Sequence, residues 1–315
     1  LNIFSYPEYI YEQSKKKKRV VIGGSHGKTS ITAMILHVLQ NLKIDCDYMV
    51  GAQLKGFDVM VKLTDDAPII ILEGDEYLSS PIDRRPKFHL YQPHIGVLSG
   101  IAWDHINVFP TFENYIDQFR IFKKMITESL IYCEEDKELR DLAKEQGDCK
   151  MISYSTPEYK IEDGISIINN TPLKIFGDHN LQNLNAAMLV CKELGVKENN
   201  FYKQIKSFSG ASNRLELITQ TNNSAIYKDF AHSPSKLKAT INAVKSQFQN
   251  RQLVACMELH TFSSLNAKFL QQYSGCMNES DIAIVFFSKE AILHKGLTPI
   301  TEEQIKSSFN KENLL

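Results

Sequence analysis

The chain has 315 residues, of which 43% are hydrophobic and 23% charged, a composition typical of soluble globular proteins with room for two domains. Its 36 Lys and Arg residues nearly balance its 37 Asp and Glu residues, so the formal net charge is -1. This balance gives no argument for nucleic acid or an anionic membrane as a partner, and we expect neither. No apolar run approaches the roughly 20 residues that cross a bilayer, and no signal-peptide pattern is present. The six cysteines form no C-x-x-C pair, so we expect reduced thiols in a cytoplasmic protein without membrane insertion.

Strand and helix patterns alternate along the first two thirds of the chain. We expect strands at 19–23, 68–72, 95–98 and 130–133, helices at 29–42, 112–125 and 180–194, and a hairpin region at 161–170. Such alternation is typical of an α/β fold around a mostly parallel sheet. The basic run from Lys15 to Arg19 is interpreted as a solvated turn before the first strand.

A second α/β series follows near Leu217. It comprises expected strands at 225–230, 253–257 and 282–287, and expected helices at 235–248 and 265–273. We therefore place a domain boundary between Leu215 and Thr221, which gives domains at 1–216 and 217–315.

The strongest local signal is the stretch Gly-Gly-Ser-His-Gly-Lys-Thr-Ser at 23–30, between a predicted strand and a predicted helix. In that context backbone N–H groups and the positive helix end can cradle phosphate oxygens. Lys28 would hold the β- and γ-phosphates of a nucleotide, and the Thr29 hydroxyl would ligate Mg²⁺. The loop is shorter than a strict Walker A motif, which needs glycine where Ile22 stands. The residues expected to bind the nucleotide here are Gly24, Ser25, His26, Gly27, Lys28, Thr29 and Ser30.

This loop resembles the ATP loop of the Mur ligases, which build the peptide of bacterial cell-wall precursors. The histidine before Gly-Lys-Thr, His26, resembles the residue found there in the branch of the family that acts on UDP-N-acetylmuramate. The resemblance extends from about Val20 to Phe262. It implies a P-loop-type central ATPase domain followed by a smaller Rossmann-like α/β domain. It also implies that the family's N-terminal UDP-binding domain is absent and that the C-terminal domain is incomplete.

Carboxylate and histidine candidates for a metal follow two predicted strands. Glu73 ends the strand at 68–72, and a carboxylate at that end of a parallel strand is well placed to bind a nucleotide's Mg²⁺. The alternative is an acidic turn. The stretch Leu-Glu-Gly-Asp-Glu-Tyr resembles the family's metal-binding block, which implies that Glu73 is a metal ligand. His105 follows the strand at 95–98, and the resemblance implies that it binds a second metal ion.

The stretch Gly-Asp-His-Asn-Leu-Gln-Asn opens the predicted helix at 180–194. Asp178 or Asn180 could act there simply as a helix N-cap. The stretch also resembles the family's G-x-H-N-x-x-N block. That resemblance implies that His179, Asn180 and Asn183 contact adenine.

Three further positions lie near the predicted domain boundary. Arg214 matches the family's hinge arginine, which reaches an ATP phosphate, although Asn213 stands where the family often has a second arginine. The stretch Asp-Phe-Ala-His-Ser-Pro at 229–234 resembles a family motif. It implies that Asp229 binds the ribose and that His232 lies near the terminal phosphate.

The resemblance implies an amide-bond ligase that uses ATP and Mg²⁺ and forms an acyl phosphate. Lys28, His105, Arg214 and His232 would be catalytic. The carboxylate would come from UDP-N-acetylmuramate. The stretch 83–88 resembles enzymes that attach a recycled L-alanyl-γ-D-glutamyl-diaminopimelate peptide, with L-alanine as the alternative amine. More distant alternatives are a ligase similar to folylpolyglutamate synthase and a non-catalytic ATP-binding module.

Overall fold

The computed structural model describes residues 3–103, 108–211 and 213–315, and these divide into two compact units. Unit 1 comprises the described residues of Leu1–Tyr159, Ile168–Ile175 and His179–Ser212. Unit 2 comprises Lys160–Ile167, Phe176–Asp178 and Asn213–Leu315. The predicted boundary after Glu216 lies close to Asn213, where the main part of unit 2 begins.

Unit 1 is built on a seven-stranded sheet with the order β3-β2-β4-β1-β5-β6-β7. All neighbouring strands are parallel except β2 and β3, which are antiparallel. The predicted α/β fold with a mostly parallel sheet is therefore confirmed. The strands are β1 (Lys18–Gly23), β2 (Asp47–Met49), β3 (Val61–Lys62), β4 (Ile69–Glu73), β5 (Ile95–Leu98), β6 (Ser129–Cys133) and β7 (Lys150–Tyr154).

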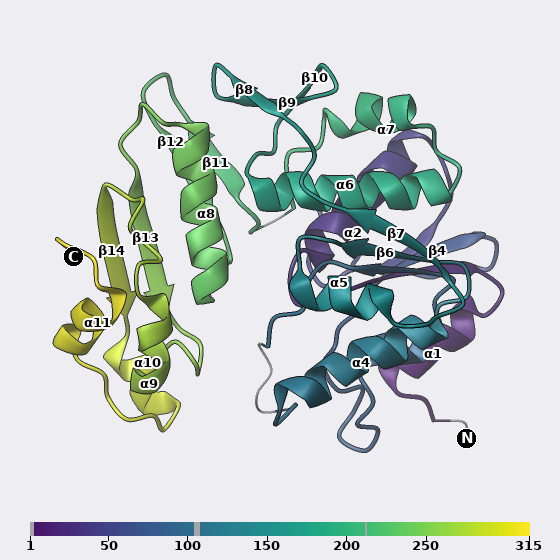
Figure 1. Cartoon of the computed structure of the whole chain (residues 1–315), viewed down its shortest axis with the longest axis horizontal. Coiled ribbons are helices and arrows are strands. Elements are labelled where there is room, and N and C mark those ends of the chain that lie inside the picture. The colour runs from purple at the N-terminus through teal and green to yellow at the C-terminus, as the bar shows by residue number, and fades with distance from the viewer. Residues whose placement is uncertain (1–2, 104–107, 212) are drawn as a thin grey trace. The chain divides into compact units, whose positions relative to one another are not determined.

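Helices cover both faces of this sheet. Figure 1 shows α2, α6 and α7 on one side and α1, α4 and α5 on the other. Two-sided cover explains why Val20, Val21 and Ile22 of β1 are all fully buried, as in other parallel sheets. The helices are α1 (Tyr6–Ser14), α2 (Lys28–Asn41), α3 (Lys87–Leu90), α4 (Phe112–Met125), α5 (Lys137–Lys144), α6 (Asp178–Glu193) and α7 (Glu198–Ile205); a short strand, β10 (Thr171–Leu173), precedes α6.

The order of the strands fixes where a ligand can bind. From β1 the chain passes through α2 to β2 on one side, and after β4 it crosses β1 to reach β5 on the other side. The carboxyl ends of β4, β1 and β5 are consequently neighbours at the point where the strand order reverses. In open α/β sheets this edge is the usual binding crevice.

Unit 2 has smaller sheets. β8 (Lys160–Glu162) pairs antiparallel with β9 (Ile165–Ile168), which confirms the predicted hairpin, and β11 (Glu216–Gln220) pairs antiparallel with β12 (Ala225–Lys228). β13 (Val254–Leu259) and β14 (Ile282–Phe287) are parallel. Their core includes stacked rings of Tyr273 and Phe309, whose centroids lie 5.0 Å apart. The helices are α8 (Pro234–Gln247), α9 (Ala267–Leu270), the 3₁₀-helix Gln271–Tyr273, α10 (Lys289–His294) and α11 (Glu302–Phe309).

The predicted helix at 265–273 is shorter than expected. The Asn266 side chain accepts a hydrogen bond from the Lys268 N–H and so caps the N-terminus of α9. Thr261 and Ser264 form a hydrogen-bonded turn immediately before it. The α-helix therefore begins only at Ala267, and the chain tightens into a 3₁₀-helix after Leu270.

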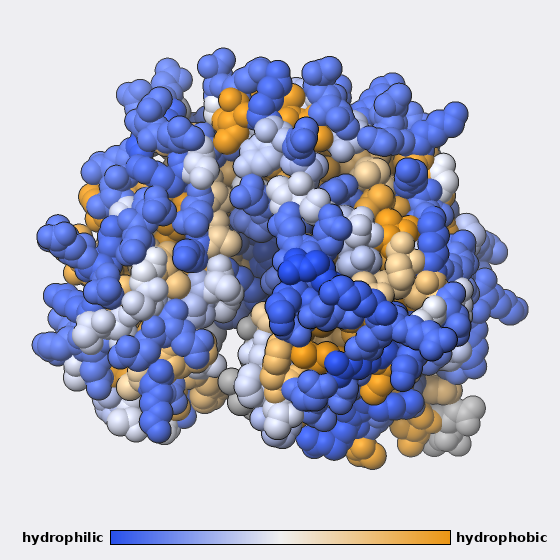
Figure 2. All heavy atoms as spheres, in the orientation of Figure 1, coloured by the Kyte–Doolittle hydropathy of each residue, from blue (hydrophilic) through white to orange (hydrophobic). Residues whose placement is uncertain are grey.

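Polar and charged side chains cover most of the face seen in Figure 2, as the balanced composition implies. Within 3–103, 108–211 and 213–315, none of the helices combines the length and the apolar character that a membrane span requires.

The interpretation of Lys15 to Arg19 as a solvated turn is wrong for two of its residues. Lys17 is buried and its ammonium lies 2.7 Å from Asp47 Oδ2, while Asp47 is fully buried at the start of β2. Arg19 is buried in β1, where its guanidinium donates to the carbonyls of Ser14 and Gln92. The positive charges are therefore used inside unit 1, at the amino end of the sheet.

We expect Lys17→Met to lower the free energy of unfolding by about 3 kcal/mol, because it leaves the Asp47 carboxylate buried without its counter-charge. The matched control is Lys62→Met, which removes an exposed pair with Asp45 and should cost under about 1 kcal/mol. Urea denaturation followed by circular dichroism measures both. Equal losses for the two variants would contradict the account of Lys17.

Candidate nucleotide-binding site

The loop between β1 and α2 has the backbone that close approach of a ligand requires. Gly24 and Gly27 adopt φ values of 117° and 76°, which side-chain-bearing residues rarely adopt. A Cβ on Gly24 would lie 2.8 Å from the backbone nitrogen of Ser99. Gly27 is the N-cap of α2 and has no side chain that could satisfy the first N–H groups of the helix. The loop and the positive end of α2 thus form a surface suited to an anion.

Lys28, the first residue of α2, points back over the loop. Its ammonium donates to the Gly24 carbonyl at 2.6 Å and to Glu76 Oε2 at 2.7 Å. Burial opposes the charged form of Lys28. The charge and hydrogen bond of Glu76, with the charges of Asp75 and Glu73, outweigh this effect and raise the pKa of Lys28. The side chain is therefore a cation at neutral pH, placed where the loop would receive phosphate.

Thr29 and Glu73 bring two oxygen ligands together at the ends of α2 and β4. The Thr29 hydroxyl donates to Glu73 Oε1 at 2.9 Å, and the other Glu73 oxygen accepts from the Gly51 N–H at 2.8 Å. Hydroxyl and carboxylate oxygens are the donors that Mg²⁺ prefers, usually completed by water and substrate phosphates. The described residues contain no cluster of three or more His, Cys, Asp or Glu side chains that could hold a metal ion by themselves. The donor set therefore fits a magnesium ion that arrives with a nucleotide.

The underside of the loop is tied to α4. Ser25 Oγ lies 2.9 Å from the Tyr115 hydroxyl, and that hydroxyl donates to Glu76 Oε1 at 3.3 Å. Ser25 also contacts Ala102, donating to its carbonyl at 2.9 Å and accepting from its N–H at 2.7 Å. The Ser25 N–H also donates to the Gly100 carbonyl at 2.9 Å, so these contacts fix the loop against the segment that follows β5.

The remaining loop residues and α6 adjoin the same edge. The His26 ring packs on Gly100, where an added Cβ would lie 2.4 Å from His26 Cε1, and Ser30 is buried in the first turn of α2. Asn183 reaches the loop from α6, because a Cβ on Gly27 would lie 2.3 Å from Asn183 Oδ1. Asn183 and Asn180 are both buried in the first turns of α6, one turn apart, and the half-buried His179 precedes Asn180.

Three sequence-predicted residues belong to unit 2, where they gather around Phe230. The Arg214 guanidinium lies 5.3 Å from the centroid of the Phe230 ring. Asp229 accepts a hydrogen bond from the Leu215 N–H at 3.1 Å. His232 Nδ1 lies 3.0 Å from the Phe230 carbonyl oxygen. Arg214, Asp229 and His232 thus form one cluster within unit 2, while His105 lies outside the described residues.

Sequence reasoning gave no role to Glu76 or Tyr115. Glu76 was part of the acidic stretch after β4, but position alone does not distinguish a buried carboxylate from an exposed one. Tyr115 has the spacing of the apolar face of α4, where Phe119 and Phe122 are also fully buried. Its hydroxyl is the only feature of the sequence that could have pointed to a polar contact in this core.

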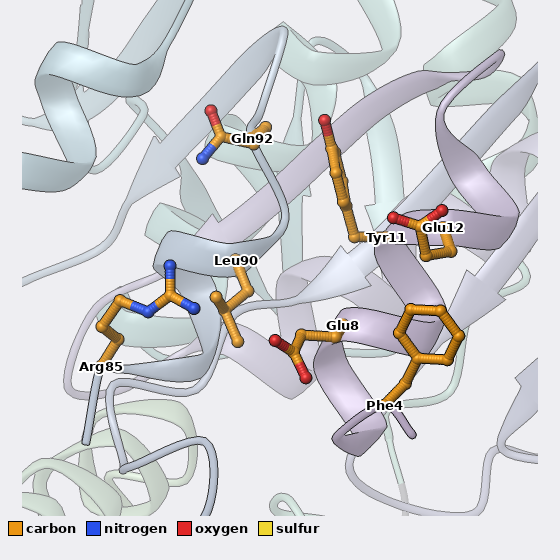
Figure 3. Close-up of a pocket in the computed structure, with 7 residues that line it drawn as sticks. All are labelled: Phe4, Glu8, Tyr11, Glu12, Arg85, Leu90 and Gln92. Atoms are coloured by element: carbon orange, nitrogen blue, oxygen red, sulfur yellow. The ribbon is translucent and has the colours of Figure 1, made fainter. Parts of the chain in front are cut away.

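The stretch 83–88 begins at the surface of unit 1 and ends in its core. Asp83 and Arg85 form an exposed ion pair with an N–O distance of 2.7 Å, whereas Phe88 stacks on Phe122 in the core. Arg85 also lines a shallow pocket beside α1, and its guanidinium and the Glu8 carboxylate point into this space in Figure 3. The lining residues are Phe4, Glu8, Tyr11, Glu12, Arg85, Leu90 and Gln92.

Comparison with known proteins places these features in a family. A sequence model described as the Mur ligase middle domain matches residues 22–191, more than half of the chain. The UDP-N-acetylmuramate–L-alanine ligase of Caldicellulosiruptor bescii is 29% identical over 328 residues, covering 97% of this chain and 69% of the relative. The corresponding enzyme of Roseiflexus sp. is 26% identical over 290 residues, covering 81% of this chain. The chain spans 60% of the length of that relative and 65% of that of the Limosilactobacillus reuteri enzyme.

Solved structures agree on the fold. The murein peptide ligase from Psychrobacter arcticus superimposes with a TM-score of 0.64 at 20% identity, covering 100% of this chain and 73% of that one. The MurF ligase from Thermotoga maritima, solved in complex with ADP, gives a TM-score of 0.72 at 16% identity, covering 98% of this chain and 73% of that one. At these identities the likeness concerns the fold. The middle-domain model matches more than half of the chain, including the loop, Glu73 and most of α6. The chain therefore belongs to the Mur ligase family.

Proposed function

We propose that this chain provides the ATP-binding machinery of an amide-bond ligase that activates the carboxylate of UDP-N-acetylmuramate. The observation that carries the proposal is the arrangement of Lys28, Thr29 and Glu73 at the carboxyl ends of β1 and β4. It supplies a partly buried lysine ammonium and a pair of oxygen ligands beside a glycine loop. Such an arrangement suits phosphoryl transfer, in which catalysis is mainly positioning and charge stabilisation.

A free carboxylate does not react with an amine at neutral pH, so the acid must first be activated. In the proposed reaction the substrate carboxylate oxygen attacks the γ-phosphorus of ATP, and the bond from that phosphorus to the β–γ bridging oxygen breaks. ADP leaves with that electron pair, and an acyl phosphate forms. The amine then attacks the acyl carbon, loses a proton and expels inorganic phosphate. Lys28 would hold the β- and γ-phosphates as charge moves toward ADP.

The other site residues have separate proposed roles. Thr29, Glu73 and His105 would hold magnesium, which when bound supplies positive charge that stabilises the transferring phosphoryl group. The loop residues Ser25, His26 and Ser30 would surround the phosphates. Asn183 lies against the loop, and together with His179 and Asn180 it would bind the adenine.

In unit 2 the same proposal concerns the cluster around Phe230. Arg214 would contribute charge to the phosphates, Asp229 would accept hydrogen bonds from the ribose, and His232 would act near the terminal phosphate. The hydrogen bond from the Leu215 N–H holds the Asp229 carboxylate beside the start of unit 2. Domain closure in such enzymes brings catalytic groups together and excludes water.

Two amines remain candidates for the second substrate. We favour the L-alanyl-γ-D-glutamyl-meso-diaminopimelate peptide, as in peptidoglycan recycling, because of the stretch 83–88 with its exposed Asp83–Arg85 pair. The second candidate is L-alanine, as in peptidoglycan biosynthesis. It is supported by the L-alanine ligase names of the curated relatives. An enzyme that uses ATP and a UDP-linked substrate would act in the cytoplasm.

Lys28→Ala should abolish formation of the acyl phosphate and lower kcat at least about a hundredfold, since it removes the cation of the loop. Circular dichroism should still show a folded protein. Phosphate release with Mg-ATP and UDP-N-acetylmuramate measures the loss, with Lys62→Ala, a change at an exposed pair, as the control. Turnover retained in Lys28→Ala would refute the role of the loop.

Thr29→Val keeps the shape of the side chain but removes the hydroxyl that faces Glu73. We expect the Mg²⁺ concentration for half-maximal phosphate release to rise at least about tenfold, as for the loss of one ligand to a nucleotide-bound ion. Titration of MgCl₂ at fixed ATP measures this change. An unchanged Mg²⁺ requirement would remove Thr29 from the metal site.

The identity of the amine is decided by a direct competition. The full-length product of the gene is assayed for phosphate release with Mg-ATP and UDP-N-acetylmuramate, with L-alanine and the tripeptide supplied in separate reactions. We expect a higher kcat/KM for the tripeptide. A higher value for L-alanine would reverse the choice of amine and leave the proposed phosphoryl transfer in place.

A further inference from the structure

The ion pair between the partly buried Lys28 and the buried Glu76 affects which ligands the loop can bind. Only 15% of the Lys28 side chain and 1% of the Glu76 side chain are exposed, and their charged atoms lie 2.7 Å apart. Glu76 follows the last residue of β4 by three positions. Lys28 is the only lysine or arginine among the loop residues 23–30, and its charge is already offset by a carboxylate.

Glu76 is held in place independently of Lys28. Its second carboxylate oxygen accepts a hydrogen bond from the hydroxyl of Tyr115, which is a fully buried residue of α4. The same hydroxyl lies 2.9 Å from Ser25 Oγ, and Ser25 is itself bonded to the backbone of Ala102. A fixed carboxylate of this kind would not follow Lys28 when the ammonium turns toward a phosphate.

A second carboxylate lies beside the same surface, because Glu73 accepts the hydrogen bond of Thr29 at the start of α2. A nucleotide without a metal ion would therefore bring several negative charges toward the carboxylates of Glu73 and Glu76, which lie beside the Lys28 ammonium. At the separations of neighbouring side chains, repulsion between like charges in a partly buried site is substantial. A divalent cation bound to the phosphates offsets this repulsion.

We propose that Glu76, anchored by Tyr115, is a positioning residue that aims Lys28 and makes the loop bind a nucleotide tightly only together with its divalent cation. The inference rests on the proposed function of the loop, which it deepens. Glu76 opposes the metal-free nucleotide through its charge. It orients the Lys28 ammonium, through the 2.7 Å contact, for transfer of the γ-phosphoryl group. This selection prevents unproductive occupation of the site by metal-free ATP or ADP.

The test compares Glu76→Gln with the unmodified protein by titration calorimetry of ADP, in excess MgCl₂ and in EDTA. Removing the charge of Glu76 should tighten ADP binding in EDTA by about tenfold. Binding in MgCl₂ should change by less than about threefold, because the metal already offsets the phosphate charge. The matched control is Glu128→Gln, which removes a carboxylate paired with Lys18 at the opposite end of the sheet. It should leave both affinities unchanged.

The outcomes separate the inference from the proposed function. Failure of the unmodified protein to bind ADP in MgCl₂ would overturn both. Tight binding in MgCl₂ with no gain for Glu76→Gln in EDTA would overturn the inference alone.

Tyr115→Phe tests the positioning role and serves also if Glu76→Gln does not fold. It retains the charge of Glu76 but removes the hydroxyl that anchors it. The ratio of ADP affinities in MgCl₂ and EDTA should stay within about twofold of the unmodified value, because the charge is kept. The kcat for phosphate release should fall at least about fivefold with an unchanged KM for ATP. The reason is that the Lys28 ammonium would be correctly oriented for phosphoryl transfer in a smaller fraction of the enzyme–ATP complexes. Unchanged kcat, or a rise in KM alone, would overturn the positioning role of this pair.

Discussion

The central position of β1 is the constraint on which the rest of unit 1 depends. Its residues Val20, Val21 and Ile22 are fully buried, and its register pairs Ile22 with Glu73 of β4 and Gly23 with Leu98 of β5. Because the three strands are parallel, whatever follows each of them must meet at one edge. The glycine loop, the acidic stretch after β4 and the segment after β5 are brought together there by hydrophobic burial and sheet register alone. The chemistry of the site is thus a consequence of how the core is packed.

Charge is buried at both ends of this sheet, with different consequences. At the amino end the Lys17–Asp47 pair is shielded from solvent, with 5% and 0% of the side chains exposed, and Lys17 supplies the counter-charge of the buried Asp47 carboxylate. At the carboxyl end the Lys28–Glu76 pair has its lysine 15% exposed, beside backbone that can receive an anion. A buried pair costs desolvation energy on both partners and is weak support for stability. At the carboxyl end the proposed function accounts for that cost, because the Lys28 ammonium would also bind a phosphate.

Much of the fold could be predicted from hydrophobic periodicity. β5, α4 and β14 have the expected bounds, β1 and β6 begin one residue earlier than expected, and β4 and α8 are each shifted by one residue. Other elements were missed although local signals exist. Ser5 with Glu8 and Thr301 with Gln304 form capping boxes at the starts of α1 and α11, and Asp136 caps α5. These helices are only 8 or 9 residues long and the edge strand β3 only two, so none of them leaves a long periodic run in the sequence.

The candidate site likewise contains residues that the sequence could indicate and contacts that it could not. The pattern of glycines and the positions of Lys28, Thr29 and Glu73 at the ends of elements are local properties, so the sequence could indicate them. The partnership of Glu76 with Lys28 and Tyr115 could not be predicted, because it joins residues 48 and 39 positions apart through tertiary packing. The burial of Lys17 and Arg19 escaped prediction for the same reason, since a run of basic residues looks identical in solvent and beside a buried aspartate.

The most direct test of the account is a crystal structure of the protein with Mg-ADP. In that structure we expect the β-phosphate on backbone N–H groups of residues 26–29 and within hydrogen-bonding distance of the Lys28 ammonium. We also expect one magnesium ion bound by Thr29 Oγ1, with Glu73 in its coordination sphere directly or through water. A nucleotide bound elsewhere, or phosphates on the loop with Lys28 turned away from them, would contradict the assignment of this edge of the sheet as the nucleotide site.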